Sequence, residues 1–275
     1  MRVAYLGPPG TFSEEAVTRC DLARGAEHVP MSTFDDAYEA VLRGDVDAAV
    51  LPIENSIEGS VGATLDLLVH RHGLMVRREI LLPVEQHLMA ARGTSLPSVT
   101  KILSHPQALA QCAAYLRRRL PGVPTEATHS TAEAARKVAE SPGQVAIGPA
   151  ASAERYGLEI LERSIQDAEG NTTRFVLVMA EDEAPTGHDK TSIAFTMDRD
   201  RPGGLHDVLG EFARRGINLS RIESRPTKRA MGHYIFFVDF EGHRLDPAGA
   251  QALAGVRSRV HSLHILGSHP RAGSP

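Results

Sequence analysis

The sequence predicts a mostly parallel α/β domain built as two lobes, followed by a smaller α+β domain with a ferredoxin-like βαββαβ order. The first domain is indicated by strand-like apolar runs and amphipathic helix patterns that alternate from residue 3 to about residue 157. Its two lobes are indicated by Pro83, where the chain leaves toward a second lobe, and by residues 160–165, where it returns. The second domain is indicated by strand and helix patterns between residues 190 and 270.

Length and composition are those of a globular protein with more than one domain. The chain has 275 residues, of which 42% are hydrophobic and 23% are charged. The net charge of −4 gives no basic footprint for nucleic acid, and we interpret the run Arg117-Arg118-Arg119 as the exposed end of a helix. Cys20 and Cys112 have no paired spacing, which fits a reducing compartment and provides no metal-ligand set. No apolar run approaches bilayer length, so we expect a cytoplasmic protein.

The first strand is expected at Val3–Leu6 and leads into the segment GPPGTFSE at residues 7–14, which turns into a helix. Two glycines let the backbone bend closely, and Thr11 or Ser13 at the helix start could offer hydroxyl and amide donors to an anion. A capped helix start without a ligand accounts for the same residues. The segment is neither a Walker loop nor the dinucleotide-binding fingerprint, because it lacks the Gly-Lys-Ser/Thr triplet and the third glycine.

Polar residues also follow the next buried strand, Ala48–Ile53. Ahead of this strand lies an amphipathic helix that is capped by Ser32 or Thr33 and stopped by Gly44. Behind the strand comes ENSIEGS at residues 54–60, where donors and acceptors gather between a strand and a helix. A ligand-binding loop and an ordinary capped loop both fit this pattern.

A third polar cluster belongs to the second lobe. After two strands that flank Pro83, a short strand delivers Ser104 and His105, and one helix is expected to continue through residue 120. Ser104, Gln107 and Gln111 lie at helical spacing on one face, so their polar groups could converge on one ligand. His105 fits a cap or a structural histidine better than a catalytic base, because nothing in the sequence pairs with it.

The fourth cluster is NTTRF at residues 171–175, which leads into a buried strand that ends at Met179. An amide, two hydroxyls and a guanidinium at the mouth of a strand suit a site that holds an anion and donates protons, because α/β sheets bind ligands beside strand ends. A polar turn that feeds an edge strand is the alternative interpretation.

These four clusters, taken in order, resemble the motifs of monofunctional prephenate dehydratases that carry a C-terminal ACT domain. GPPGTFS at residues 7–13, PIENSIEG at 52–59, SHPQ at 104–107 with the following Gln111-Cys112, and NTTRF at 171–175 have that family's order and spacing over nearly the whole chain. The resemblance implies a bilobal catalytic domain, similar to type II periplasmic binding proteins, with its active site in the cleft between the lobes. It implies no metal and no cofactor.

By this resemblance, the reaction is the decarboxylative dehydration of prephenate to phenylpyruvate, water and CO2 in phenylalanine biosynthesis. Thr173 matches the family's essential threonine and is predicted to give a hydrogen bond or a proton to the departing hydroxyl. Arg174 is predicted to bind a carboxylate, with support of the loop as its alternative role. The predicted substrate-binding residues are Asn55, Ser56, Ser104, Gln111, Thr11, Glu54 and Phe175.

A second set of motifs lies in the C-terminal part. GGL at residues 203–205, GINL at 216–219 and ESRP at 223–226 resemble the amino-acid-binding ACT domains attached to prephenate dehydratases. The resemblance implies that phenylalanine binds between two such domains and inhibits the enzyme, so we expect a homodimer or a dimer of dimers. Members usually have alanine at the position of Gly204, and glycine there loosens the helix start by roughly 0.5 to 1 kcal/mol. The predicted effector-binding residues are Gly203, Gly204, Leu205, Asn218, Leu219, Glu223, Ser224, Arg225 and Pro226.

These patterns predict three segments. The catalytic domain is expected at residues 1–180, with its first lobe at about 1–82 and 166–180 and its second lobe at about 83–165. Residues 181–189 are acidic, contain Pro185 and Gly187, and are predicted to be a linker. The regulatory domain is expected at residues 190–270.

Two other functions also fit the sequence. The same fold could take arogenate, in which an amino group replaces the keto oxygen of prephenate, and no residue decides between the two substrates. A non-enzymatic amino-acid sensor would combine a binding-protein-like fold with a regulatory domain. Residues 171–175 argue against the sensor, because a sensor has no need of a hydroxyl and a guanidinium beside a leaving group.

Overall fold

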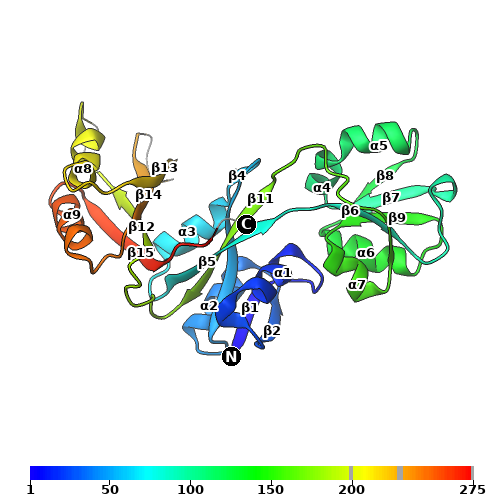
Figure 1. The fold of residues 1–275 in the computed structure, drawn as a ribbon, viewed down its shortest axis with the longest axis horizontal. Coiled ribbons are helices and arrows are strands. Elements are labelled where there is room, and N and C mark those ends of the chain that lie inside the picture. Colours follow the sequence, from blue (N-terminus) through cyan, green and yellow to red (C-terminus); the bar gives the residue numbers. More distant parts are fainter. Residues whose placement is uncertain (198–200, 228–231, 274–275) are drawn as a thin grey trace.

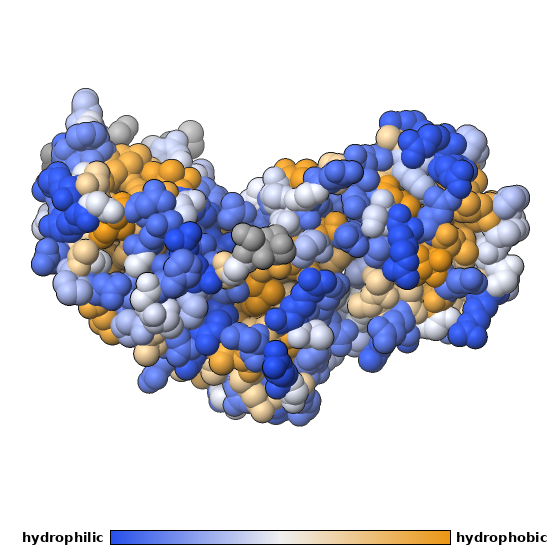
Figure 2. All heavy atoms as spheres, in the orientation of Figure 1, coloured by the Kyte–Doolittle hydropathy of each residue, from blue (hydrophilic) through white to orange (hydrophobic). Residues whose placement is uncertain are grey.

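Three sheets form three parts of the molecule, and Figure 1 shows the first lobe between the second lobe and a C-terminal module. The computed structural model describes residues 1–197, 201–227 and 232–273. Residues 189–270 make up the C-terminal module. Figure 2 shows hydrophilic side chains over much of the visible surface and a hollow outline between the module and the second lobe. The predicted combination of a bilobal α/β domain and a ferredoxin-like domain is confirmed.

The sheet of the first lobe has the order β2-β1-β3-β11-β5, with the short β4 paired to β3. β1 is parallel to β2 and β3, whereas β11 runs antiparallel to both β3 and β5. The predicted parallel sheet is therefore mixed, because the chain leaves this lobe after β5 and re-enters it along β11 in the opposite direction. The elements are β1 Arg2–Leu6, α1 Phe12–Arg19, β2 Glu27–Met31, α2 Phe34–Leu42, β3 Ala48–Asn55, β4 Gly59–Ser60, α3 Gly62–His70, β5 Met75–Pro83 and β11 Thr172–Met179.

Different elements cover the two faces of this sheet. α1 packs on one face, where Val17 joins Tyr5 and Phe175 in an apolar cluster. α2, α3 and part of the C-terminal module pack on the other face, where Val176 and Val178 are buried. Odd and even residues of β11 therefore face different neighbours, as the pleat of a strand requires.

The sheet of the second lobe has the order β10-β6-β9-β7-β8. The single helix predicted after residue 105 is wrong, because α4 ends at Gln111, Cys112 leaves helical geometry and α5 begins at Ala113. Asp167 caps α5, since its carboxylate accepts the backbone N–H groups of Ala114 (2.7 Å) and Tyr115 (2.9 Å). The elements are β6 His87–Ala90, β7 Lys101–Ser104, α4 Pro106–Gln111, α5 Ala113–Arg119, β8 Thr125–Ala127, α6 Thr131–Ala139, β9 Gln144–Gly148, α7 Ala150–Tyr156 and β10 Glu159–Glu162.

Two crossing segments connect the lobes, and they are hydrogen-bonded to each other. The backbone N–H of Val84 donates to the carbonyl of Asn171 at 2.8 Å, and the N–H of Ile165 donates to the carbonyl of Gln86 at 2.8 Å. The N–H of Gln86 donates to Oε1 of Gln166 at 2.9 Å. The base of the interlobe cleft is thus a paired, two-stranded hinge.

The C-terminal module has the predicted βαββαβ order, and its sheet has the strand order β13-β14-β12-β15. Its helices cover one face. The other face packs on the first lobe, where Ala194, Ile235 and Phe237 share a core with Val76. The elements are β12 Asp189–Thr196, α8 Gly204–Ala213, β13 Leu219–Pro226, β14 Tyr234–Glu241, α9 Pro247–Arg257 and β15 Ser262–Pro270.

The contact between module and first lobe is close at Gly267 of β15. A Cβ at this position would lie 2.4 Å from the carbonyl oxygen of Val76 in β5, and the φ of +136° suits glycine. The predicted linker is bound to both neighbouring parts. Asp182 accepts a hydrogen bond from Nε of Arg244 in the module at 2.7 Å, and Glu183 accepts one from Arg78 of the first lobe at 2.5 Å. The segment boundaries near residues 82, 166 and 181 remain predictions, which we keep.

Within the described ranges, no helix combines the length and the apolar character needed to span a bilayer.

Candidate active site

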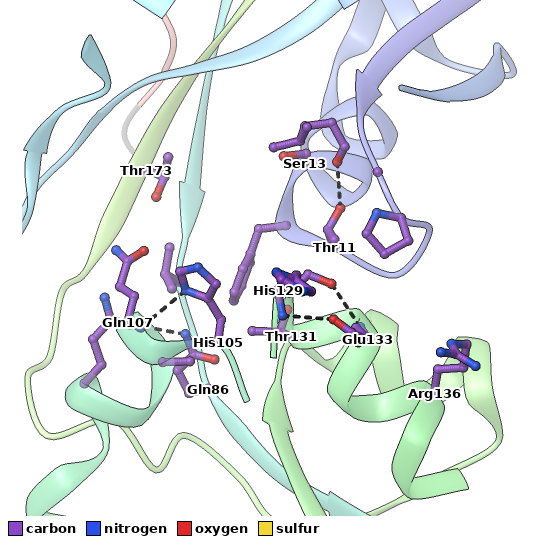
Figure 3. Close-up of a pocket in the computed structure, with 18 of the residues that line it drawn as sticks. Thr11, Ser13, Gln86, His105, Gln107, His129, Thr131, Glu133, Arg136 and Thr173 are labelled. Carbon is purple, nitrogen blue, oxygen red and sulfur yellow. Dashed lines mark hydrogen bonds between the residues drawn. The ribbon is translucent and has the colours of Figure 1, made fainter. Parts of the chain in front are cut away.

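A cleft of about 620 Å³ lies between the two lobes. Figure 3 shows that Thr11, Ser13 and Thr173 approach it from the first lobe, and that His105, Gln107 and Glu133 approach it from the second. The polar lining residues are Thr11, Ser13, Ser32, Asn55, Gln86, His105, Gln107, Gln111, His129, Ser130, Thr131, Glu133, Arg136, Tyr156 and Thr173.

Thr173 is half-buried on β11 and lines the cleft with its hydroxyl. Its Oγ1 accepts a hydrogen bond from Nδ2 of Asn55 at 2.9 Å, and the same Nδ2 donates to Oδ1 of Asn171 at 2.7 Å. Within the described part of the chain, the Thr173 hydroxyl donates to no acceptor. Its hydrogen is therefore free to point at a bound molecule.

Asn55 fixes this arrangement from β3. Its Oδ1 accepts the backbone N–H groups of Ile57 and Glu58, both at 3.0 Å, and because those groups can only donate, they set the orientation of the amide. Asn55 was predicted to orient the substrate directly. The side chain is only 8% exposed and both of its ends are occupied within the protein, so in this structure it holds Thr173, and its direct contact with the substrate stays a prediction.

The neighbouring Thr172 points elsewhere. Its hydroxyl donates to the carbonyl of Gly170 at 3.4 Å, and its backbone N–H donates to Oγ of Ser56 at 3.0 Å. Neither Thr172 nor Ser56 lines the cleft, so the structure places the predicted substrate residue Ser56 outside the cleft lining. Because the two threonines are successive in a strand, they face opposite sides.

Arg174 also lies outside the cleft. The side chain is buried on the module side of β11, where Nε donates to Glu79 at 2.8 Å and Nη1 donates to Asp239 at 2.5 Å. Burial alone would lower the pKa of Arg174, but the carboxylates of Asp239, Glu79 and Glu54 outweigh it and raise that pKa above its ordinary value. This position favours the alternative role of supporting the loop over the predicted clamp on a substrate carboxylate, and the reason is again the alternation of a strand.

Three further predicted substrate residues do not line the cleft. Ser104 is fully buried, and its hydroxyl donates to the carbonyl of Ile147 at 2.6 Å. Phe175 is 2% exposed and packs in the core under α1. Glu54 lies 3.9 Å from Arg174 on the module side. For Glu54 and Phe175 the prediction followed motif membership, whereas Ser104 was expected on the face of a helix and instead ends strand β7.

The second lobe contributes the starts of α4 and α6 to the cleft. His105 caps α4, with Nδ1 accepting the N–H of Gln107 at 3.3 Å, so the capping role weighed for it is confirmed. Ser130 caps α6 by accepting the N–H of Glu133 at 3.0 Å. Arg136, also on α6, is the sole arginine or lysine among the described lining residues and forms no salt bridge within them.

Gln86 is a lining residue that sequence reasoning missed. It lies on the hinge, is 3% exposed, and its Nε2 donates to Oε1 of Gln111 at 3.2 Å. This bond leaves the NH₂ group of Gln111 available to the cleft, as predicted for a substrate donor. The clue in the sequence is a polar residue at the crossing after Pro83, where apolar strands surround it.

The segment at residues 7–13 joins the two lobes at one edge of the cleft. The hydroxyl of Ser152 on α7 donates to the carbonyl of Gly10 at 2.6 Å, and Tyr156 donates to the carbonyl of Pro9 at 3.1 Å. Thr11 caps α1, since its Oγ1 accepts the N–H of Glu14 at 3.5 Å, and it lines the cleft as well. Both interpretations of this segment are therefore compatible with the structure.

The predicted effector residues lie in two places. Gly203 begins α8 with a φ of +77°, and a Cβ on Gly204 would lie 2.3 Å from Cε of Met197. On β13, Glu223 accepts a short hydrogen bond from the Ser60 hydroxyl, and Arg225 lies 3.9 Å from Asp66 of α3. The ESRP strand thus contacts the first lobe as well as the module. The remaining predicted effector residues, Leu205, Asn218, Leu219, Ser224 and Pro226, belong to α8, to β13 or to the turn before β13.

Among the described residues, no group of three or more His, Cys, Asp or Glu side chains is arranged to hold a metal ion.

Comparisons with known proteins match both parts of the chain. The family described as Prephenate dehydratase matches residues 3–183, and the family described as ACT domain matches residues 191–257. A protein named Prephenate dehydratase from Amycolatopsis methanolica is 42% identical over 274 residues, which cover 98% of this chain and 89% of the relative.

Two solved structures share the whole fold. A crystal structure of Prephenate dehydratase in complex with L-Phe from Arthrobacter aurescens has a TM-score of 0.90 and 40% identity over 99% of this chain and 90% of that one. A structure described as GqqA, a novel type of quorum quenching acylase, has a TM-score of 0.88 and 31% identity over 99% of this chain and 98% of that one. The fold alone therefore does not fix the activity.

Proposed function

This chain belongs to the prephenate dehydratase family, and from that premise we propose that Thr173 donates the hydrogen bond or the proton to the hydroxyl that leaves prephenate. The enzyme is a hydro-lyase that converts prephenate to phenylpyruvate, water and CO2. The observation that carries the proposal is the Thr173 hydroxyl at the wall of the interlobe cleft, whose hydrogen has no acceptor in the described part of the chain and whose oxygen is fixed by Asn55.

The chemistry explains why one positioned donor suffices. The ring carboxylate departs as CO2, its electron pair enters the ring, and the C–O bond at the opposite carbon breaks as the ring becomes aromatic. The departing oxygen takes up one proton and leaves as water. A donor at that oxygen stabilises the negative charge that develops there. Thr173 is half-exposed, so solvent can return a proton that it gives away.

The two carboxylates of prephenate need partners other than Arg174. Arg136 is unpaired within the described residues, α6 presents its N-terminal N–H groups, and Gln111 has a free NH₂ group. These groups belong to the second lobe, and Figure 3 shows Arg136 and Glu133 of α6 across the cleft from Thr173. We place the carboxylates against this second-lobe side of the cleft, because guanidinium, amide and helix-start N–H groups are all donors to anions.

The direct test is to incubate the purified chain with prephenate and follow the enolate absorbance of phenylpyruvate. We expect turnover, and parallel kinetics with arogenate decide whether that substrate is used as well. Turnover of arogenate without turnover of prephenate would overturn prephenate as the substrate.

We also propose that L-phenylalanine binds the C-terminal module and lowers activity, and that the chain pairs through this module as a homodimer or a dimer of dimers in the cytoplasm. The support is the match of residues 191–257 to the ACT domain and the L-Phe complex of the Arthrobacter aurescens relative. The N-terminus of α8 at Gly203 offers backbone N–H groups to a carboxylate.

Calorimetry and kinetics on the full chain test the effector. Gly203→Ala should weaken phenylalanine binding, because a residue with a Cβ disfavours the φ of +77° that presents the α8 start. Gly187→Ala is the matched control, since Gly187 has a φ of +83° and open space but lies outside the module. Absence of phenylalanine binding to the wild type, or equal weakening by both variants, would contradict the assignment.

A further inference from the structure

We propose that Arg174 is a positioning residue that anchors Thr173 to the C-terminal module through Asp239, so that the docking of the module sets the geometry of the catalytic donor. The inference rests on the proposed role of Thr173. It assigns a function to a residue that the sequence placed in the cleft and that the structure places behind it.

The backbone couples the two side chains directly. Thr173 and Arg174 are successive residues of β11, and each pairs with successive residues of both neighbouring strands. Thr173 is opposite Asn55 on β3, and Arg174 is opposite Glu54. A displacement of the Arg174 side chain therefore acts on the strand segment that carries the hydroxyl, with one peptide unit between them.

Arg174 is held by both parts of the molecule at once. Its Nε bonds Glu79 of the first lobe at 2.8 Å, and its Nη1 bonds Asp239 of β14 at 2.5 Å. Asp239 is 3% exposed and Glu79 is 8% exposed, so the pairs are shielded from water. Lys190 of β12 also donates to both oxygens of Glu79, at 2.9 and 2.8 Å. Two strands of the module thus close one buried charge network under β11.

The charges in this network can remain buried only while the module stays docked. Burial alone would raise the pKa of Asp239, but the surrounding donors and cations, with the Arg174 guanidinium the foremost and Arg221 beside it, together outweigh burial and hold that pKa below its ordinary range. A buried charge that loses one partner is strongly destabilised, whereas a complete pair is tolerated. A small rotation of the module must therefore either carry Arg174 with it or break the pair, and both outcomes alter β11.

The predicted effector strand contacts the same strand pair. On β13, Arg221 donates to the hydroxyl of Ser60 at 2.9 Å and lies 3.7 Å from Glu54. Glu223 accepts a hydrogen bond from Ser60 as well. Ser60 is opposite Glu54 in the β3–β4 pairing, and Glu54 is opposite Arg174. Two module strands, β13 and β14, therefore reach the residues directly behind Asn55 and Thr173.

The experiment measures kcat and KM of the full chain for prephenate, with and without saturating phenylalanine. Asp239→Asn keeps the shape of the side chain and removes the charge that holds Arg174. We expect kcat to fall about 10-fold or more with KM within about 2-fold, because a misplaced catalytic group loses rate and not substrate affinity. We also expect the factor by which phenylalanine lowers activity to shrink. Asp239→Glu should restore part of kcat.

Two controls separate positioning from loss of stability. Glu211→Gln removes a carboxylate that is 4% exposed and bound by Arg215 and Arg259 entirely within the module. Asp182→Asn removes a charge pair with Arg244, which joins the module to the segment that precedes it and lies away from β11. Both substitutions should lower thermal stability. Both should leave kcat, and the factor by which phenylalanine lowers activity (the phenylalanine factor), near the wild-type values.

The outcomes are distinct. If Asp239→Asn loses stability as the controls do but keeps kcat and the phenylalanine factor, the proposal is overturned. If Asp239→Asn does not fold, Arg174→Lys takes its place, since lysine keeps the charge but cannot reach Glu79 and Asp239 with one planar group, and it must show the same loss of kcat. If phenylalanine does not lower the activity of the wild type, only the proposed regulation is contradicted. The comparison of kcat without phenylalanine still tests whether Arg174 positions Thr173. Normal turnover by Thr173→Ala would remove the catalytic premise itself.

Discussion

The cleft face and the module face of β11 satisfy their polar groups in opposite ways. On the cleft face, Thr173 is half-buried, and its hydroxyl accepts one hydrogen bond from Asn55. Among the described residues, this hydroxyl donates to no acceptor. On the module face, the Arg174 guanidinium is buried and bound by Glu79 and Asp239. A group that must act on a ligand is held on one side only, whereas a group that must stay in place is held from several sides.

This difference shows how one five-residue motif serves two purposes. The residues of NTTRF were interpreted as one cluster, yet the pleat of the strand sends Thr173 into the cleft and Thr172 and Arg174 away from it. Adjacent positions in a motif can therefore belong to different functional sites. The comparison of the two faces can be tested at several positions.

The largest effect is expected at the cleft face. Thr173→Ala should lower kcat by roughly 10²-fold or more, on the scale of a lost catalytic donor, while the fold is retained. Thr172→Ala is the matched control on the opposite face, and we expect it to stay within about 3-fold of the wild type, because the carbonyl of Gly170 is the sole partner of its hydroxyl among the described residues. Steady-state kinetics on both variants check the contrast, and equal losses would erase the distinction between the faces.

An intermediate effect is expected where the module contacts the first lobe. Gly267→Ala should lower the free energy of unfolding by about 2 kcal/mol or more, because the added Cβ collides with the backbone of Val76 at a φ of +136°. Gly122→Ala is the control, since Gly122 also has a positive φ but has no atom within 4 Å of its Cβ position. Denaturant unfolding gives both values, and a cost at Gly267 no larger than that at Gly122 would argue against tight docking.

The smallest effect is expected from pH, again on the module face. Burial lowers the pKa of His264, helped by His72 and His70, and burial lowers the pKa of His269 against the attraction of Glu79. The unfolded chain then binds protons near its ordinary histidine pKa of about 6.5 before the native chain does, so stability falls as pH drops from 7.5 to 5.5. We expect a melting temperature lower by a few degrees at pH 5.5.

A substitution tests whether His264 causes this pH dependence of the melting temperature. His264→Asn should flatten the slope of melting temperature against pH, because its ring stacks on His72 of the first lobe with centroids 5.5 Å apart. His206→Asn is the control, since the side chain of His206 is 88% exposed. A slope that both substitutions leave unchanged would place the titrating groups elsewhere.

Local pattern in the sequence determined much of this protein. Apolar periodicity predicted the βαββαβ module, and polar clusters at strand ends predicted the residues around the cleft, including Thr173, Thr11 and Gln111. Capping residues predicted where helices begin, as at Thr33, whose Oγ1 accepts the N–H of Asp36 at 3.0 Å. These features depend on neighbours within a few residues, which a sequence displays directly.

Tertiary structure alone decided which polar residues face the cleft. The break between α4 and α5 comes from Asp167, which is more than 50 residues away in the chain. Gln86 reaches Gln111 only because the two crossings pair, and Arg174 is captured by Asp239 of another domain. Strand alternation explains why Thr173 and Arg174 face opposite sides, but the sequence does not show which side is the cleft or which residues lie there. Those are long-range contacts, and long-range contacts exist only once the chain has folded.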